Sequence, residues 1–176
     1  VARHETAVSH QAWGYAETSG DPAATVVVPG PGDMNALNGL KNAANDCTPL
    51  VHIAVETEPE VRGGDGIHET PPETYDPVLK ENILVDRPAA TRVELTRAIE
   101  TATTPLKGPV RVGIPKNFLE QDRPLATPSN RSESTSRGAP KADIQDAAVC
   151  LGNATQPVIL VGGGARAAGA TGELLA

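Results

Sequence analysis

The sequence predicts an α/β fold: a three-layer arrangement in which a parallel sheet carries helices on both faces. Short apolar runs alternate along the chain with segments in which apolar residues recur every three or four positions. The apolar runs have few polar residues on either face, which is typical of parallel strands buried on both sides. With 176 residues the chain is long enough for one ordinary domain and the start of another.

The first part of the chain contains two helix–strand units. A helix is predicted over residues 5–18, and a strand follows at Ala24–Val28. After the loop 29–32, Asp33 is expected to cap a second helix that ends near Asn45. The run "PLVHIAV" that follows has the composition of a second buried strand.

Residues 56–90 are polar, rich in Pro and Gly, and without sustained periodicity, so they predict a long loop with one short strand at Ile83–Val85. Thr91 and Glu94 have the spacing of a capping box and predict the start of a helix. A third strand is predicted at 108–115.

The composition changes at residues 120–141, where Ser, Thr, Pro, Arg and Glu dominate, as in a linker. Beyond it, Asp143 is expected to cap a short helix, and "QPVILVGGGARAAGA" predicts a strand, a glycine loop and the start of a helix. The predicted organisation is therefore a domain over 1–119, a linker over 120–141 and the start of a second domain over 142–176. Because the chain begins with Val and its last strand has no following partner, both ends are expected to be truncated.

Charge and cysteine content exclude several classes of protein. The formal net charge is −7 and the pI is about 5.1, and no basic run is present that could displace counterions from nucleic acid phosphates. No apolar run approaches the length of a membrane span. Cys47 and Cys150 lack the spacing of a zinc site or a disulfide framework, which favours a cytoplasmic protein.

Four stretches occur in order along residues 1–119: "RHETAVSHQAWGYAETSG", "PGPGDMNALNGL", "NDCTPLVHIAV" and "GPVRVGIPKNF". Together they resemble the pyrimidine-binding domain of thiamine-diphosphate-dependent enzymes, in the group that contains acetolactate synthase, pyruvate oxidase and related decarboxylases. The segment after the linker resembles the entry to that group's Rossmann-like central domain, which holds FAD in some members.

The resemblance implies a catalytic role for Glu5, which matches the glutamate that hydrogen-bonds N1′ of the aminopyrimidine ring. That contact favours the imino tautomer, whose nitrogen takes the proton from C2 of the thiazolium. A dry site is expected to raise the pKa of Glu5. Taken from the residue alone, Glu5 is better explained as a first-turn carboxylate that complements the helix dipole, and the surrounding motifs reverse that preference.

The resemblance also implies that the loop at Pro29, Gly30 and Gly32 lies beside the aminopyrimidine, with Asn35 close by. Glycine allows backbone to approach a ligand closely. The simpler alternatives are an ordinary connection between a strand and a helix, and a polar first-turn residue at Asn35.

The loop over residues 64–68 contains a possible metal-binding motif and a candidate substrate-contacting residue. Gly64-Asp65-Gly66 looks like the family's motif for the Mg²⁺ diphosphate, but that motif belongs to a later domain, so a turn is predicted here and no metal ligand is assigned in this chain. Acetolactate synthases carry a Phe-Gln pair where this chain has Ile67 and His68. His68 is a candidate for contacting substrate, or else a solvent-exposed loop residue.

The function implied by the resemblance is carboligation or decarboxylation of a 2-keto acid such as pyruvate, by a transferase or lyase. Branched-chain amino-acid biosynthesis is one setting for such chemistry. The cofactors implied are thiamine diphosphate and Mg²⁺, whose ligands are expected in a domain absent from this chain, and FAD as in some members. The active site would lie between subunits of a homodimer or tetramer, so the chain alone is expected to be inactive.

Two alternatives from other classes stay open. One is a non-catalytic interaction protein that has kept a half-site fold. The other is a Rossmann-type nucleotide-binding module that uses the glycine run at 162–164.

Overall fold

The computed structural model describes residues 1–63, 69–121 and 138–175, which fall into two units, Val1–Arg131 and Ser132–Ala176. The strands of the first unit are β1 Ala23–Val27, β2 Leu50–Glu56, β3 Glu81–Leu84 and β4 Pro109–Pro115. Its helices are α1 Glu5–Ser19, α2 Pro31–Asn45, α3 Thr91–Thr103 and α4 Lys116–Leu119, with 3₁₀ turns η1 Pro59–Val61, η2 Pro72–Tyr75 and η3 Pro88–Ala90.

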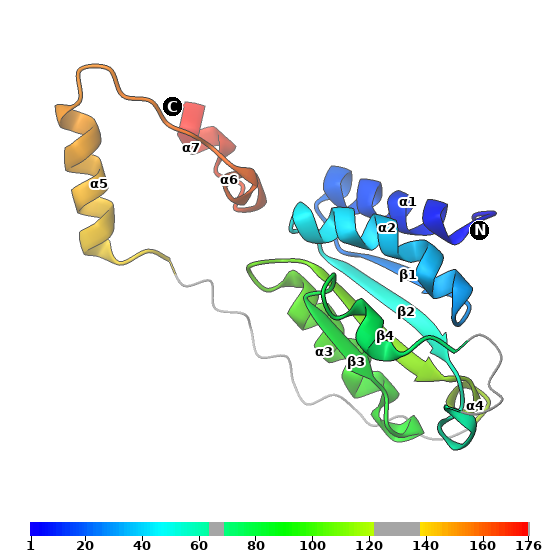
Figure 1. Cartoon of the computed structure of the whole chain (residues 1–176). Helices are drawn as coiled ribbons and strands as arrows, with labels where there is room; N and C mark the ends of the chain where they lie inside the picture. Colours follow the sequence, from blue (N-terminus) through cyan, green and yellow to red (C-terminus); the bar gives the residue numbers. More distant parts are fainter. Residues whose placement is uncertain (64–68, 122–137, 176) are drawn as a thin grey trace. The chain divides into compact units, whose positions relative to one another are not determined.

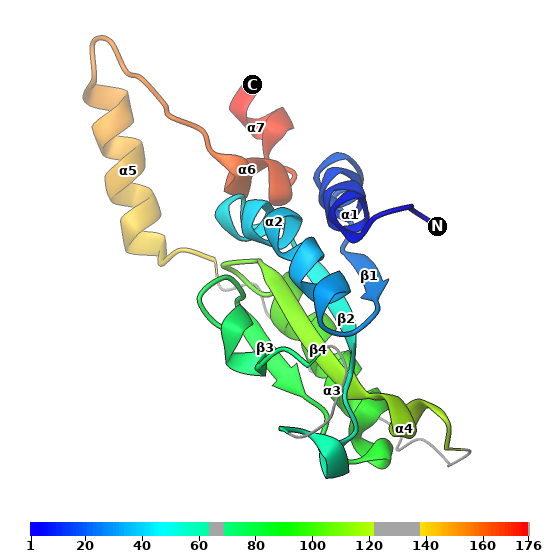
Figure 2. The ribbon, with the colours of Figure 1, turned by 45° about the vertical axis from the view of Figure 1, so that its right-hand side comes forward.

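Among the described residues the strands form one parallel sheet in the order β1-β2-β4-β3. The helices α1 and α2 lie side by side over one face of the sheet and α3 covers the other (Figures 1 and 2). Each face has its own apolar cluster, one packed against α1 and α2 and the other against α3. The predicted α/β class, with a parallel sheet between helical layers, is confirmed.

The strand β1 differs from the prediction of strands buried on both faces. Val26, which alternates along β1 with the buried Thr25 and Val27, is 65 % exposed. The reason is the position of α3, which lies over β2, β3 and β4 and leaves β1 uncovered. Within the described residues β1 pairs with β2 alone, so it forms an edge of the sheet.

Two helix caps predicted in the first unit are wrong. The helix α2 begins at Pro31, with Gly30 as its N-cap at φ 61°, so Asp33 already lies inside the first turn. Proline suits that first position because its missing amide would be unpaired there. Similarly, the turn η3 runs directly into α3, so that Thr91 is helical, and no side chain caps the helix.

The second unit contains α5 Lys141–Asn153, α6 Gly163–Ala167 and α7 Thr171–Leu175. The short helix expected here is present as α5, but Pro140 is its N-cap, so Asp143, the expected cap, already lies in its first turn. The strand expected within "QPVILV" is not formed, and Val158 and Leu160 are almost fully exposed, at 92 % and 98 %. A strand needs a neighbouring strand to bond its backbone, and the described part of this unit has none.

Two glycines in α1 and α2 predict opposite effects of the same substitution. A Cβ on Gly39 of α2 would lie 2.8 Å from the backbone carbonyl carbon of Ser9 in α1, whereas a Cβ on Gly14 would meet nothing within 4 Å. Gly39→Ala should therefore lower the free energy of unfolding by about 1–3 kcal/mol, and Gly14→Ala should raise it by about 0.5–1 kcal/mol. Urea denaturation of both variants checks this, and the same sign in both would contradict the close packing of α1 on α2.

Candidate functional site

Glu5 opens α1 and faces the first turn of α2. Nδ1 of His4, the N-cap, accepts a hydrogen bond from the Thr6 amide at 3.2 Å and so fixes the start of the helix. Nδ2 of Asn35 donates to Oε2 of Glu5 at 3.3 Å. The pKa of Glu5 is lowered by a hydrogen bond from its own backbone amide and then by the bond from Asn35. The prediction that burial raises this pKa is wrong for the chain by itself, because the carboxylate stays open to solvent.

The first turn of α2 lies against the Glu5 carboxylate. A Cβ on Gly32 would come within 3.2 Å of Oε1 of Glu5 and 2.5 Å of Cγ2 of Val28, so only glycine fits without a shift. The Thr6 hydroxyl donates to the Asn35 carbonyl at 2.8 Å and ties the two helices together at this end. Glu5, Gly32 and Asn35 are thus brought together, although 27 residues or more separate Glu5 from the others in the sequence.

A groove of about 660 Å³ opens beside this cluster. Its walls are the first residues of the chain, the exposed side of α1 and the edge strand β1. Glu5 lines the groove at one end, where Val28 leads into the loop of Pro29 and Gly30. The carboxylate is therefore accessible to a ligand.

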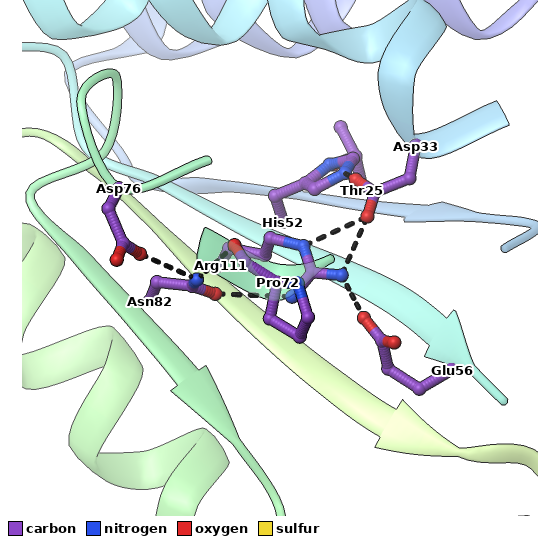
Figure 3. A network of polar contacts seen from close by, with 8 residues as sticks. All are labelled: Thr25, Asp33, His52, Glu56, Pro72, Asp76, Asn82 and Arg111. Carbon is purple, nitrogen blue, oxygen red and sulfur yellow. Dashed lines mark hydrogen bonds and ion pairs between the residues drawn. The ribbon is translucent and has the colours of Figure 1, made fainter. Parts of the chain in front are cut away.

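A row of polar side chains crosses the face of the sheet that α1 and α2 cover, with one residue from each strand. The strand registers pair Thr25 with His52, His52 with Arg111, and Arg111 with Asn82. The Thr25 hydroxyl lies 2.6 Å from Nδ1 of His52, and Nη1 of Arg111 donates to Oδ1 of Asn82 at 3.1 Å (Figure 3). We call these four residues the polar row.

Asp33, in the helix α2 that covers this face of the sheet, is hydrogen-bonded to two residues of the polar row. Nε2 of His52 lies 2.8 Å from its Oδ1, and Nε and Nη2 of Arg111 donate to its Oδ2 at 2.9 and 2.7 Å. Arg111 also forms an ion pair with Glu56 at the end of β2. Burial alone would raise the pKa of Asp33, but the bond from His52 and the charge of Arg111 hold it below its ordinary value. Asp33 is therefore an anion, and Nε2 of His52 carries the proton between them.

At the Asn82 end of the polar row, hydrogen bonds connect the sheet to the loop before β3. Nδ2 of Asn82 donates to the Pro72 carbonyl at 2.8 Å and to Oδ1 of Asp76 at 2.9 Å (Figure 3). The Arg111 guanidinium lies over the ring of Tyr75, with Cζ 4.3 Å from the ring centre. Burial, and then the charge of Asp33, raise the pKa of the Tyr75 phenol well above its ordinary range.

The sequence patterns do not predict these buried polar residues. They predict Asp33 as a helix cap and place His52 and Arg111 within apolar strands. The available signal was the presence of a histidine and an arginine at inward positions of such strands, since charged groups are rarely buried without partners.

Some predicted residues lie outside the described part of the chain. His68 and the Gly64-Asp65-Gly66 turn belong to residues 64–68, and most of the predicted linker belongs to residues 122–137. Within the ranges that the structure does describe, no group of three or more His, Cys, Asp or Glu side chains is arranged to hold a metal ion. In the same ranges, no helix is long and apolar enough to cross a membrane.

The chain is similar to known proteins, and one family model matches the segment that contains this site. Residues 1–76 match the model described as thiamine pyrophosphate enzyme, N-terminal TPP binding domain. The probable acetolactate synthase large subunit of Methanocaldococcus jannaschii is 30 % identical over 182 residues, which cover 99 % of this chain and 31 % of the relative. The acetolactate synthase isozyme 3 large subunit of Escherichia coli is 32 % identical over 180 residues, again 99 % and 31 %. The chain thus spans about a third of the length of these curated relatives.

Solved structures agree on the fold. A putative thiamin diphosphate-dependent enzyme from Mycobacterium smegmatis superposes with a TM-score of 0.77 at 25 % identity, over 89 % of this chain and 30 % of that one. Benzoylformate decarboxylase from Polynucleobacter necessarius superposes with a TM-score of 0.81 at 23 % identity and the same coverage.

Proposed function

We propose that this chain, a member of the thiamine pyrophosphate enzyme family with acetolactate synthase large subunits among its homologues, supplies the half of the active site that binds the aminopyrimidine ring of thiamine diphosphate. The observation that carries the proposal is the hydrogen bond from Asn35 to Glu5 beside an open groove, at a place where a Cβ on Gly32 would come within 3.2 Å of the same carboxylate.

The residues at this site fit such a ring. Glu5 presents a carboxylate with free lone pairs, which suits a ring nitrogen that shares a proton. The missing side chain of Gly32 leaves space that a Cβ would fill. Pro29 and Gly30 lead into that turn, so we assign Glu5, Pro29, Gly30, Gly32 and Asn35 to the cofactor site.

When bound, thiamine diphosphate supplies an acidic thiazolium carbon that adds to the carbonyl of a 2-keto acid once its proton is lost. With the ring bound, Glu5 would share a proton between its carboxylate and a ring nitrogen and would act as an acid–base group. Asn35 orients the carboxylate through Oε2. Covering the carboxylate removes it from solvent and raises its pKa, which improves proton sharing.

The remaining parts of the proposal concern the whole protein. It acts on a 2-keto acid, such as pyruvate, by carboligation or decarboxylation in the cytoplasm. The Mg²⁺ and diphosphate site comes from another part of the protein, across the subunit interface of a homodimer or tetramer. Residues 1–119 form the pyrimidine-binding domain, and residues 142–176 belong to the next domain. FAD is a candidate ligand of that next domain, and adding FAD to the cofactor titration described below tests this.

Cofactor titration of the full-length gene product tests this function. Thiamine diphosphate with Mg²⁺ should bind and support the consumption of pyruvate, and the 176-residue chain alone should show no turnover. Binding of a dinucleotide without thiamine diphosphate would instead support a nucleotide-binding module. The structure gives this alternative no support, because the strand expected before the glycine run is not formed in the described part of the second unit. Absence of any cofactor binding would favour an interaction protein.

A further inference from the structure

Asp33 occupies a position from which it could cap α2, but its carboxylate points away from the helix. It is the third residue of α2, whose N-cap, Gly30, has no side chain that could bond the free amides at that helix start. Aspartate at a helix start commonly bonds these amides. Here both oxygens are bound to the sheet instead, one by His52 of β2 and the other by Arg111 of β4.

Burying such a network of charged side chains in a core carries a high desolvation cost. Asp33, His52 and Arg111 are each 1 % exposed or less. Apolar residues of similar volume often stabilise a core as well as a buried ion network does, so the network indicates a need for defined geometry. The three donors leave the Asp33 carboxylate no freedom to rotate.

The fixed carboxylate is connected to Glu5 by a short path. Gly32, next to Asp33, lies against Oε1 of Glu5, and Asn35, two residues further on, donates to Oε2. The hydroxyl of Thr6, the residue after Glu5, also donates to the Asn35 carbonyl. The positions of Gly32 and Asn35 relative to Glu5 therefore depend on how the first turn of α2 is placed on the sheet.

We propose that Asp33 is a positioning residue: by binding His52 and Arg111 it anchors the first turn of α2 to the sheet, and so holds Gly32 and Asn35 in register with Glu5. The consequence for cofactor binding rests on the function proposed above. Because Asp33 is only 1 % exposed, its proposed role is to position other residues and not to bind a ligand itself.

Asp33→Asn and Glu56→Gln form a matched pair for the test. Each replaces a buried carboxylate that binds Arg111 by an amide of the same shape, but only Asp33 belongs to α2. In the full-length protein, calorimetry with thiamine diphosphate and Mg²⁺ should give a Kd raised about tenfold or more for Asp33→Asn, and less than about threefold for Glu56→Gln. Similar losses in both, in proportion to their losses of stability in urea, would reduce Asp33 to a structural role. His52→Leu, which removes one donor and keeps the ion pair, replaces Asp33→Asn if that variant does not fold, with the same expected direction.

Amide hydrogen exchange gives a readout that needs no cofactor. Exchange in residues 34–38 of α2 should become faster in Asp33→Asn relative to exchange in α3, and this ratio should stay near the parent value in Glu56→Gln. An unchanged ratio in Asp33→Asn overturns the inference whether or not the cofactor binds. A raised ratio in a protein that never binds thiamine diphosphate supports the anchoring of α2 and refutes the proposed function.

Discussion

Replacing Glu5 with glutamine should slow the turnover of pyruvate by the full-length protein by about 10²- to 10⁴-fold, the range for removing an acid–base group. Glutamine keeps the shape of the side chain and its contact with Asn35, so the Kd for thiamine diphosphate should change far less than the rate. Steady-state kinetics at saturating cofactor, together with a cofactor titration of the same preparation, separate the two quantities.

Glu94 provides the control for this experiment. It is also an acidic residue in the first turn of a helix, α3, and it forms an exposed ion pair with Arg97 at 2.8 Å. If Glu5 only complemented the dipole of α1, Glu5→Gln and Glu94→Gln would have equally small effects on activity and on stability. Unchanged turnover in Glu5→Gln with cofactor bound would return Glu5 to that simpler role.

The periodic apolar patterns predicted most of the sheet and its helices because they follow burial, the main driving force of folding. The helix expected over 5–18 is α1, and the strand expected at 108–115 is β4, in which all seven residues are buried. The order of the four motifs along the chain indicated which residues lie around Glu5, although the hydrogen bond with Asn35 joins residues 30 positions apart.

The polar row could not be predicted in the same way, because its partners are set by strand register and not by local spacing. Arg111 binds Asp33 across 78 positions, and nothing near either residue in the sequence indicates the other. The strand expected within "QPVILV" and not formed in the described residues has a related cause. An apolar run becomes a strand only beside another strand, and local pattern does not say whether one is available.

Replacing Arg111 with methionine should lower the free energy of unfolding by about 3–5 kcal/mol, a large part of the stability of a domain of this size. Methionine fills similar space, but the carboxylates of Asp33 and Glu56 are left buried with no cation between them. Urea denaturation at pH 7 measures the loss. Adding Asp33→Asn and Glu56→Gln to the same protein should recover most of it, because no uncompensated charge is then buried.

The dependence on pH separates the charge of Arg111 from its packing. In the parent the pKa of Asp33 is lowered, so this group stabilises the fold above its unfolded pKa of about 3.9, and the contribution is lost as pH falls through the folded pKa. In Arg111→Met the same burial raises the carboxyl pKa above the unfolded value, so the fold gains stability as the pH falls through it. The difference in unfolding free energy between parent and variant should therefore narrow as pH is lowered from 7 to 4. A constant difference would assign the loss to the packing of Arg111 on Tyr75.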